Sequence, residues 1–182
     1  MRAIPTLIDE IFIIEPVIYG DERGFFFESW NQKQFNKAVN QEVTFVQDNH
    51  SRSSKGVLRG LHYQLKQSQG KLVRVVSGAV LDVAVDIRKS SPTFGKHVAV
   101  ELTAENYKQL WVPAGCAHGF MVLTESVDFI YKTTDYYSPK DEKCIQYNDP
   151  DLNIDWQLNG TKPKLSEKDR QGIPFKDSEY FP

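Results

Sequence analysis

The sequence predicts an all-β protein, a sandwich or barrel made of many short strands. Apolar residues recur with a period of two along most of the chain. Turn-forming segments such as Ser77-Gly78 and residues 90–95 separate the apolar stretches. Helical periodicity is weak. Repeated short strands with turns between them are typical of closed or packed sheets.

Period-two patterns define the expected strands in chain order. They cover residues 43–47, 57–65, 71–76, 81–87, 97–102, 108–112, 119–124 and 127–133. The clearest is 81–87, in which alternate residues from Leu81 to Ile87 are apolar while Asp82, Ala84 and Asp86 share the opposite side. We expect this strand to have one apolar face.

Two helices and one domain complete the predicted architecture. One helix is expected at Asn31–Val39 and another begins at Ser166 in a proline-containing tail. No repeat or interdomain linker is evident, and 182 residues with 40% hydrophobic content suit one core. We expect a single domain over residues 1–182, with its core at about 10–150 and a short helical tail.

Composition argues against several classes of partner. The 22 basic and 24 acidic residues give a net charge of -2, so a broad nucleic-acid surface is not expected. Apolar runs such as 11–14 are too short to cross a bilayer, and the N-terminal residues lack a signal-peptide core. A cytoplasmic protein with no membrane partner is expected. Cys116 and Cys144 have no spacing typical of a disulfide framework.

His62 is the first candidate for chemistry, because histidine exchanges protons near neutral pH. Lys71 has the strand parity of Val73 and Val75, which directs its ammonium inward, although solvent exposure at the start of a strand is equally open. Tyr131 also has inward parity, and most inward tyrosines are core residues.

The other histidines give no metal-binding pattern. His118 follows a loop rich in proline and glycine, where it either serves a site at a barrel mouth or caps the turn. We expect no functional role for His50 or His97. Because HxH and HxxxH spacings are absent, we expect no metal site.

Two charged residues lie in unusual settings. Arg23 stands between two glycines and before three phenylalanines, a pattern that favours a hairpin turn followed by a core strand. Asp169 lies three residues after Ser166 and fits a helix cap. An alternative is that Asp169 reaches His62 and orients its imidazole, as carboxylates do for catalytic histidines.

Five segments occur in this order along the chain: RGLHYQ, QGKLVRVVSGAVLDVAVDIRKSSPTFGK, WVPAGCAHGF, YKTTDYYSP and LSEKD. Together they resemble one family, the dTDP-4-dehydrorhamnose 3,5-epimerases. The resemblance covers roughly residues 4–175. It implies a cupin-type jelly-roll barrel, a homodimer that exchanges strands, and neither a metal nor an organic cofactor.

The resemblance also implies a substrate and catalytic roles. The substrate is dTDP-4-dehydro-6-deoxy-D-glucose, whose C4 ketone acidifies the protons at C3 and C5. His62 is implied as the base and Asp169 as its dyad partner. Lys71 is implied beside the C4 oxygen and Tyr131 as the proton donor to C5, on the opposite face of the sugar.

Binding residues follow from the same resemblance. Arg23 and Arg59 match positions that contact the diphosphate, while His118 and Asp82 match polar groups near the sugar. The matches in the nucleotide pocket are Tyr19, Phe26, Glu28, Gln47, Asn49 and Tyr136. The loop at 64–69 is the stretch least like the family.

Three other functions stay open. One is an enzyme that epimerises only C3 or shifts the ketone of a related dTDP-keto-sugar. The second is a non-catalytic cupin that binds sugar nucleotides, which should lack the base or its partner. The third is a metal-dependent cupin oxygenase, which the spacing of the histidines disfavours.

Overall fold

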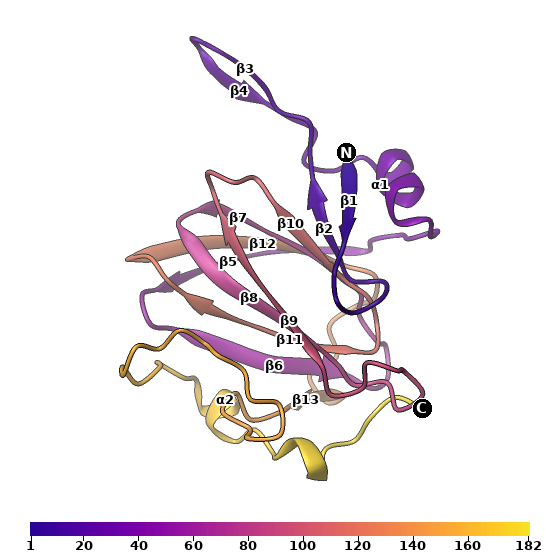
Figure 1. The fold of residues 1–182 in the computed structure, drawn as a ribbon, viewed down its shortest axis with the longest axis vertical. Coiled ribbons are helices and arrows are strands. Elements are labelled where there is room, and N and C mark those ends of the chain that lie inside the picture. Colours follow the sequence, from indigo (N-terminus) through magenta and orange to yellow (C-terminus); the bar gives the residue numbers. More distant parts are fainter.

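Two antiparallel sheets face each other in the computed structural model, which describes residues 1–182 (Figure 1). The six-stranded sheet has the order β1-β2-β10-β7-β12-β5, and the five-stranded sheet has the order β13-β6-β11-β8-β9. The all-β jelly-roll prediction is confirmed. The strands of the two sheets are β1 (Arg2–Pro5), β2 (Phe12–Glu15), β5 (Gln47–Ser54), β6 (Leu58–Gln64), β7 (Lys71–Ser77), β8 (Ala79–Asp86), β9 (His97–Thr103), β10 (Gln109–Val112), β11 (Cys116–Val122), β12 (Ser126–Thr133) and β13 (Glu142–Cys144).

The main core fills the space between the two sheets. Phe129 of β12 stacks on Phe120 of β11, with ring centroids 4.4 Å apart, and so joins the two sheets. Val73 and Val75 of β7 belong to the same buried cluster. Their inward direction is the one that strand parity predicts, and burial of these side chains is the main stabilising term for the barrel.

Strand β8 has the expected apolar face, and its opposite face is buried as well. Leu81, Val83 and Val85 pack outward against a second cluster that includes Trp156 and Phe175 of the C-terminal segment. The opposite side of the strand faces the barrel interior, where Asp82 and Asp86 are fully buried. The tail therefore covers the side that the sequence marks as apolar, and the acidic residues lie inside.

Helix α1 (Gln32–Val39) covers part of the outer face of the six-stranded sheet, and its expected position is confirmed. Asn31 caps the helix by accepting a hydrogen bond from the Gln34 N–H, and the chain leaves through Asn40 in the left-handed conformation. Phe35 packs edge-on against Trp111 of β10, with ring centroids 5.4 Å apart.

The expected strand at 43–47 is wrong. Residues 42–46 form no strand, and β5 begins only at Gln47. Val43 and Phe45 instead pack on the aromatic cluster beneath α1. Their alternating pattern reflects that packing, whereas the true strand carries mostly polar side chains and is held by pairing with β12.

Strand β11 begins earlier than the expected 119–124. It runs from Cys116 to Val122, so the loop after β10 contains only residues 113–115. His118 is consequently in the middle of a buried strand and does not cap a turn. The remaining expected strands agree with the structure to within one or two residues at most of their ends.

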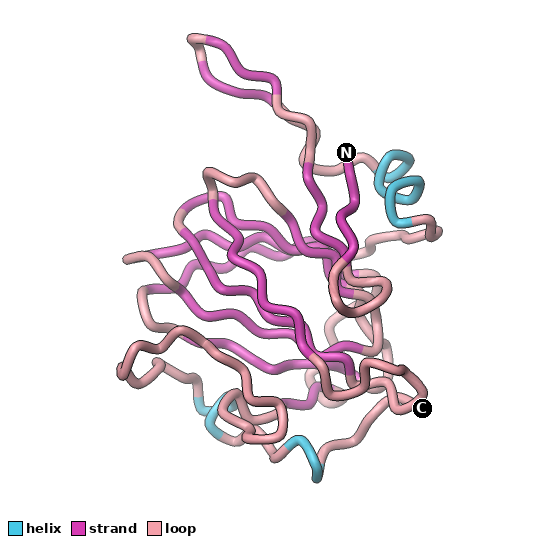
Figure 2. The backbone as a smooth tube through the Cα atoms, in the orientation of Figure 1, coloured by secondary structure: helices cyan, strands magenta, loops and turns pink.

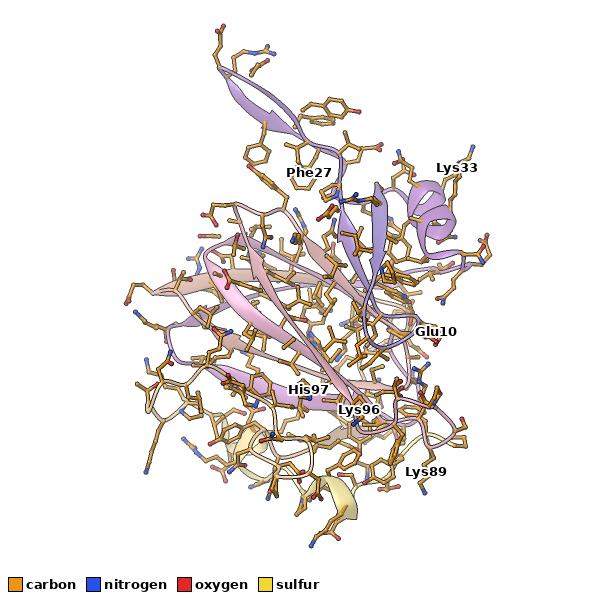
Figure 3. The ribbon with its side chains drawn as sticks, viewed as in Figure 1. Glu10, Phe27, Lys33, Lys89, Lys96 and His97 are labelled. Carbon is orange, nitrogen blue, oxygen red and sulfur yellow. The ribbon has the colours of Figure 1, made fainter.

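A hairpin of β3 (Tyr19–Asp21) and β4 (Gly24–Phe26) extends away from the barrel (Figure 1). The turn at Arg23 is confirmed, but the expected core strand after it is wrong. Phe25 and Phe26 are 60% and 67% exposed. Phe27, at the base of the hairpin, packs edge-on against Tyr107 from the β9–β10 loop (Figure 3).

The C-terminal segment after β13 is mostly loop and wraps the outer side of the five-stranded sheet (Figure 2). It contains the short helix α2 (Glu167–Arg170) and a 3₁₀ turn at Phe175–Asp177. Neither these elements nor α1 have the length and apolar character needed to span a bilayer.

Candidate active site

One cavity of about 320 Å³ lies between the two sheets and is lined by side chains from both. Its walls come from β5, β7 and β12 on one side and β6, β11 and β13 on the other. The lining residues are Gln47, Asn49, Ser51, Arg59, His62, Gln69, Lys71, His118, Gly119, Phe120, Phe129, Tyr131, Tyr137, Glu142 and Lys168. A larger, shallow depression over α1 is lined by seven polar residues and contains none of the expected site residues.

His62 projects into the cavity from β6, and Asp169 approaches it from the first turn of α2. Asp169 Oδ1 is 2.8 Å from His62 Nε2. The contact is short, but Nε2 makes no well-aligned hydrogen bond, so the attraction is mainly electrostatic. The structure therefore brings together two residues that are 107 positions apart in the sequence.

The helix cap and the dyad use the same carboxylate. Asp169 Oδ2 accepts hydrogen bonds from the backbone N–H and the hydroxyl of Ser166, which completes a capping box. Oδ1 also accepts from the Gly60 N–H at 3.0 Å. Burial alone raises the pKa of Asp169, but contacts with His62, Ser166 and Gly60 outweigh burial and hold the pKa well below its ordinary value. Asp169 therefore caps helix α2 and also lies beside His62, so the geometry agrees with both interpretations of this residue.

Glu142 lies on the other side of the imidazole. Its Oε1 is 3.8 Å from His62 Nδ1, and its Oε2 accepts hydrogen bonds from Tyr137 and Lys168. Burial raises the pKa of Glu142, but the ammonium of Lys168 and the hydroxyl of Tyr137 outweigh burial, and the net pKa is below its ordinary value. His62 is thus placed between two ionised carboxylates.

Lys71 lines the cavity from the start of β7, in the inward direction that its parity predicts. No carboxylate lies within salt-bridge distance of its ammonium. Burial lowers the pKa of Lys71 to about 8, and the more distant charges of Glu142 and Asp82 offset only part of that effect. A cation in this position is poorly compensated by the protein and is available to a negatively charged ligand atom.

Tyr131 lines the cavity from β12, beside the strand that carries Lys71. It pairs in register with Val73 on one side and Asn49 on the other. Burial raises the pKa of Tyr131 above its ordinary value, and the charge of Glu142 adds to the effect. The hydroxyl therefore holds its proton at neutral pH and can act as a donor.

His118 and Asp82 form a second histidine–carboxylate pair. His118 Nε2 is 2.9 Å from Asp82 Oδ1, and both side chains are buried. His118 lines the cavity and pairs in register with His62 of the neighbouring strand, whereas Asp82 lies behind it on β8. The pair fixes the ring of His118 at the cavity wall.

Gln47, Asn49 and Arg59 are the remaining expected residues that line the cavity. The Nδ2 atom of Asn49 is buried and has no hydrogen-bond partner in the protein, so it is free to donate to a bound molecule. The Arg59 guanidinium donates from Nε to the Ser53 hydroxyl at 3.2 Å and forms no ion pair.

The structure does not bring the other expected binding residues to this cavity. Tyr19, Arg23 and Phe26 lie on the projecting hairpin, where the Arg23 guanidinium pairs with Asp21. Glu28 accepts hydrogen bonds at the start of α1 from two side chains, Asn31 and Gln34. Tyr136 is 59% exposed on the loop after β12.

Sequence reasoning missed several residues that line the cavity. Tyr137 and Lys168 lie inside two of the segments that carry the family resemblance, so their presence there was an available signal. Glu142 follows Lys140 and Asp141 in a polar stretch without periodicity. Nothing in that pattern distinguishes it from a solvated surface residue.

His62, Cys144 and Asp169 are a group whose ligand atoms all lie within 4.8 Å of one another. Their chemistry does not suit a metal ion. Burial raises the pKa of the Cys144 thiol to about 12, whereas a thiol that binds metal must lose its proton. Both oxygens of Asp169 already accept hydrogen bonds, from Gly60 and Ser166. This group fits an oriented imidazole better than a coordination site.

Comparison with known proteins agrees with this geometry. The family model described as dTDP-4-dehydrorhamnose 3,5-epimerase matches residues 5–177. The chain is 58% identical over 182 residues to the dTDP-4-dehydrorhamnose 3,5-epimerase of Pseudomonas aeruginosa, with all of both chains covered.

Solved structures place the chain in the same group. The crystal structure of dTDP-6-deoxy-D-glucose-3,5-epimerase from Legionella pneumophila, in complex with dTDP-4-keto-L-rhamnose, superposes with a TM-score of 0.95 at 56% identity and covers 98% of this chain and 94% of that one. A 3'-monoepimerase from Streptomyces bikiniensis, in complex with dTDP-quinovose, has a TM-score of 0.87 at 34% identity over 96% of this chain and 87% of that one. The chain belongs to the dTDP-4-dehydrorhamnose 3,5-epimerase family.

Proposed function

We propose that His62 is the base in the reaction of this family, the conversion of dTDP-4-dehydro-6-deoxy-D-glucose to dTDP-4-dehydro-L-rhamnose by inversion at C3 and C5. The observation that supports this role is the convergence of His62, Lys71 and Tyr131 on one cavity from different strands. A base, a fixed cation and a proton donor are the three groups that such a reaction needs.

Asp169 supports the role of His62 by its position. Its carboxylate is next to Nε2 of the imidazole, which favours the tautomer with the proton on Nε2 and leaves Nδ1 to accept a proton. The carboxylates of Asp169 and Glu142 both stabilise the imidazolium that forms. Loss of either charge makes proton removal from the sugar less favourable.

The proposed step begins when Nδ1 of His62 removes the proton on carbon C3 or C5. The C–H electron pair moves to form the enolate, and negative charge collects on the C4 oxygen. Lys71 stabilises that charge, because its ammonium is in the cavity and has no close carboxylate partner. A fixed cation in a site with little water is more effective than one in bulk solvent.

Inversion requires a proton from the other face of the enolate. Tyr131 supplies it at C5, since the two sheets carry Tyr131 and His62 on different walls of the cavity. Its hydroxyl gives the proton to carbon as the enolate electron pair returns. Burial raises the pKa of Tyr131, so the tyrosinate that results is unfavourable and readily regains a proton.

The remaining cavity residues bind the substrate in this proposal. His118, held by Asp82, contacts the sugar, and Arg59 contacts the diphosphate. Gln47 and Asn49 provide amide groups for the nucleotide side of the cavity. The unpaired Nδ2 of Asn49 supports a ligand at that position.

A homodimer completes the proposed site. The hairpin carries Tyr19, Arg23 and Phe26, which are expected to bind the nucleotide, but none of them lines the cavity of its own chain. Exposed aromatic surface on a projecting hairpin is typical of a protein contact. We therefore infer that the hairpin reaches the cavity of a second copy, where its arginine pairs with the diphosphate and an aromatic ring stacks on the thymine.

Incubation with dTDP-4-dehydro-6-deoxy-D-glucose in deuterated water tests the function. NMR locates the deuterium, and a 4-reductase added afterwards reports whether rhamnose forms. Label at both C3 and C5 with rhamnose formed supports the 3,5-epimerase. Label at C3 alone would indicate the narrower epimerase, and absence of label despite substrate binding would indicate a non-catalytic binder.

A further inference from the structure

The loop after β12 is held in place by side chains rather than by backbone pairing. We call residues 134–138 the tyrosine loop. No backbone group of residues 135–137 forms a hydrogen bond with another backbone group. Loops without such pairing are mobile unless other contacts fix them. The position of this loop therefore depends on the side chains that bind it.

Three glutamines from three different segments supply most of these contacts, and the Thr133 hydroxyl adds one to the Asp135 carbonyl at 2.9 Å. Gln69 donates to the Asp135 carbonyl at 2.9 Å, and Gln47 accepts from the Tyr137 N–H at 3.1 Å. Gln64 binds the loop twice, because its Oε1 accepts from the Ser138 N–H at 2.9 Å and its Nε2 donates to the Tyr136 carbonyl at 3.2 Å.

Gln64 differs from the other two glutamines in its surroundings. Gln47 and Gln69 line the cavity, whereas Gln64 is 4% exposed and does not. It also donates to the Gln67 carbonyl at 2.8 Å, so both ends of its amide are satisfied. A buried amide with these contacts has one rigid position, and it transmits that position to the tyrosine loop.

The tyrosine loop in turn places a hydroxyl on the carboxylate that faces the proposed base. Tyr137 donates to Glu142 at 2.6 Å, and Glu142 faces Nδ1 of His62. Gln64 is two residues after His62 on β6 and pairs in register with Glu142 on β13. One strand thus carries both the base and the residue that anchors the loop opposite it.

We propose that Gln64 is a positioning residue for the epimerase reaction. It fixes the tyrosine loop so that Tyr137 holds the Glu142 carboxylate against His62. The proposal rests on the assigned role of His62 and adds a residue that acts only through others. Displacement of a group near the chemistry by about 1 Å is enough to slow an enzyme strongly, so loss of this anchor lowers kcat.

The test compares Gln64→Met, which keeps the length of the side chain and removes both loop contacts, with Tyr137→Phe, which removes only the hydroxyl. We expect kcat to fall about tenfold in each, with KM changed less than about threefold. The double variant Gln64→Met/Tyr137→Phe should be no slower than the slower single variant, because both changes break the same link.

Thr6→Val is the matched control. The Thr6 hydroxyl also makes three contacts with the backbone of a loop, to Ile8 and Ile11 in the β1–β2 connection, outside the cavity. This variant should lose stability and keep its kcat. If Gln64→Met does not fold, Gln64→Asn keeps a neutral amide at the same position but shortens the side chain by one methylene, so it cannot hold the Ser138 N–H and the Tyr136 carbonyl as Gln64 does, and it should also lower kcat.

Two results overturn the proposal. One is wild-type kcat in a folded Gln64→Met or Gln64→Asn variant, and the other is a double variant whose losses multiply. The His62→Ala variant distinguishes failure of the positioning role of Gln64 from failure of the proposed function. If His62→Ala is inactive while Gln64 variants are normal, only the positioning role is wrong, whereas an active His62→Ala variant contradicts both.

Discussion

The cavity and the β3–β4 hairpin differ in one respect: the cavity is formed entirely by residues of one chain, whereas the hairpin projects away from its own chain. In the cavity, His62 and Asp169 meet at 2.8 Å and are packed among buried residues from two sheets. On the hairpin, Tyr19 is 63% exposed, and the Arg23 side chain is 85% exposed with Asp21 of the same hairpin as its partner. The cavity is therefore pre-organised within one chain. The hairpin carries side chains suited to binding a ligand, but no cavity of the same chain surrounds them.

In the proposed function, this difference separates the catalytic groups of the cavity from the nucleotide-binding groups of the hairpin. Proton transfer needs groups held at fixed distances, which the barrel provides because the strands that carry His62, Lys71 and Tyr131 are each paired on both sides. Recognition of a nucleotide tolerates contacts that form only on assembly. We therefore expect changes at His62, Lys71 and Tyr131 to lower kcat, and changes in the hairpin to raise KM or weaken the proposed dimer.

His62→Ala should give the largest effect. Removal of the base is expected to lower kcat by about 10³-fold to 10⁴-fold, with folding and dimer formation unchanged. Steady-state turnover and the deuterium label at C3 and C5 measure it. His50→Ala is the matched control, because His50 is an exposed histidine that also pairs with a carboxylate, Asp128, at 2.9 Å. Near-normal turnover of His62→Ala contradicts the assignment.

Substitution of Lys71 should give the second-largest loss of kcat, and the contribution of Lys71 should depend on pH. Lys71→Met is expected to lower kcat by about 10²-fold to 10³-fold. Because the pKa of Lys71 is about 8, its ammonium is present below that pH and is lost as the pH rises through it. In the wild type, kcat/KM should therefore fall above about pH 8. Lys71→Arg keeps its charge, so persistence of the same alkaline limb in that variant excludes Lys71 as its source.

Tyr131→Phe should separate proton removal from inversion at C5. Proton removal continues because His62 and Lys71 are intact, so exchange with deuterated water persists, while inversion at C5 is impaired about 10²-fold or more. Product analysis by NMR distinguishes the configuration at C5 from isotope exchange. Normal inversion at C5 removes Tyr131 from the mechanism.

Arg23→Ala should give the smallest change in this series and a different kind of change. We expect KM to rise about tenfold or more from the loss of a charge-assisted contact with the diphosphate, with kcat close to the wild-type value. Arg52→Ala, which removes another exposed arginine that is paired with a carboxylate, controls for loss of surface charge. A large loss of kcat in Arg23→Ala breaks the proposed division between the two regions.

The strands that alternation predicts are those whose inner faces fill the core. Alternation predicts residues 71–76 and 127–133 because Val73 and Val75, like Val127 and Phe129, are buried two positions apart. Strand β5 could not be found in this way, because its side chains are mostly polar and its position is fixed by pairing with β12. The alternating Val43 and Phe45 are misleading because they pack on the aromatic cluster beneath α1.

The site was predictable only in part. Parity alone directs Lys71 and Tyr131 inward, and the structure agrees. The meeting of His62 with Asp169 depends on the path of the whole C-terminal segment across the outer face of a sheet, which no local pattern encodes. The residues alone leave that contact as an alternative to a helix cap, the family resemblance favours it, and neither indicates Glu142.

Subunit complementation tests the division between the two regions most directly. His62→Ala and Arg23→Ala are mixed and allowed to exchange subunits, with mass spectrometry to count the mixed dimers. If the hairpin serves the partner's cavity, each mixed dimer has one intact site, and activity at low substrate concentration rises above that of both unmixed variants. Mixing His62→Ala with Lys71→Met should give no gain, because both changes lie in the cavity. Verified mixed dimers of His62→Ala and Arg23→Ala with no gain in activity would contradict the account.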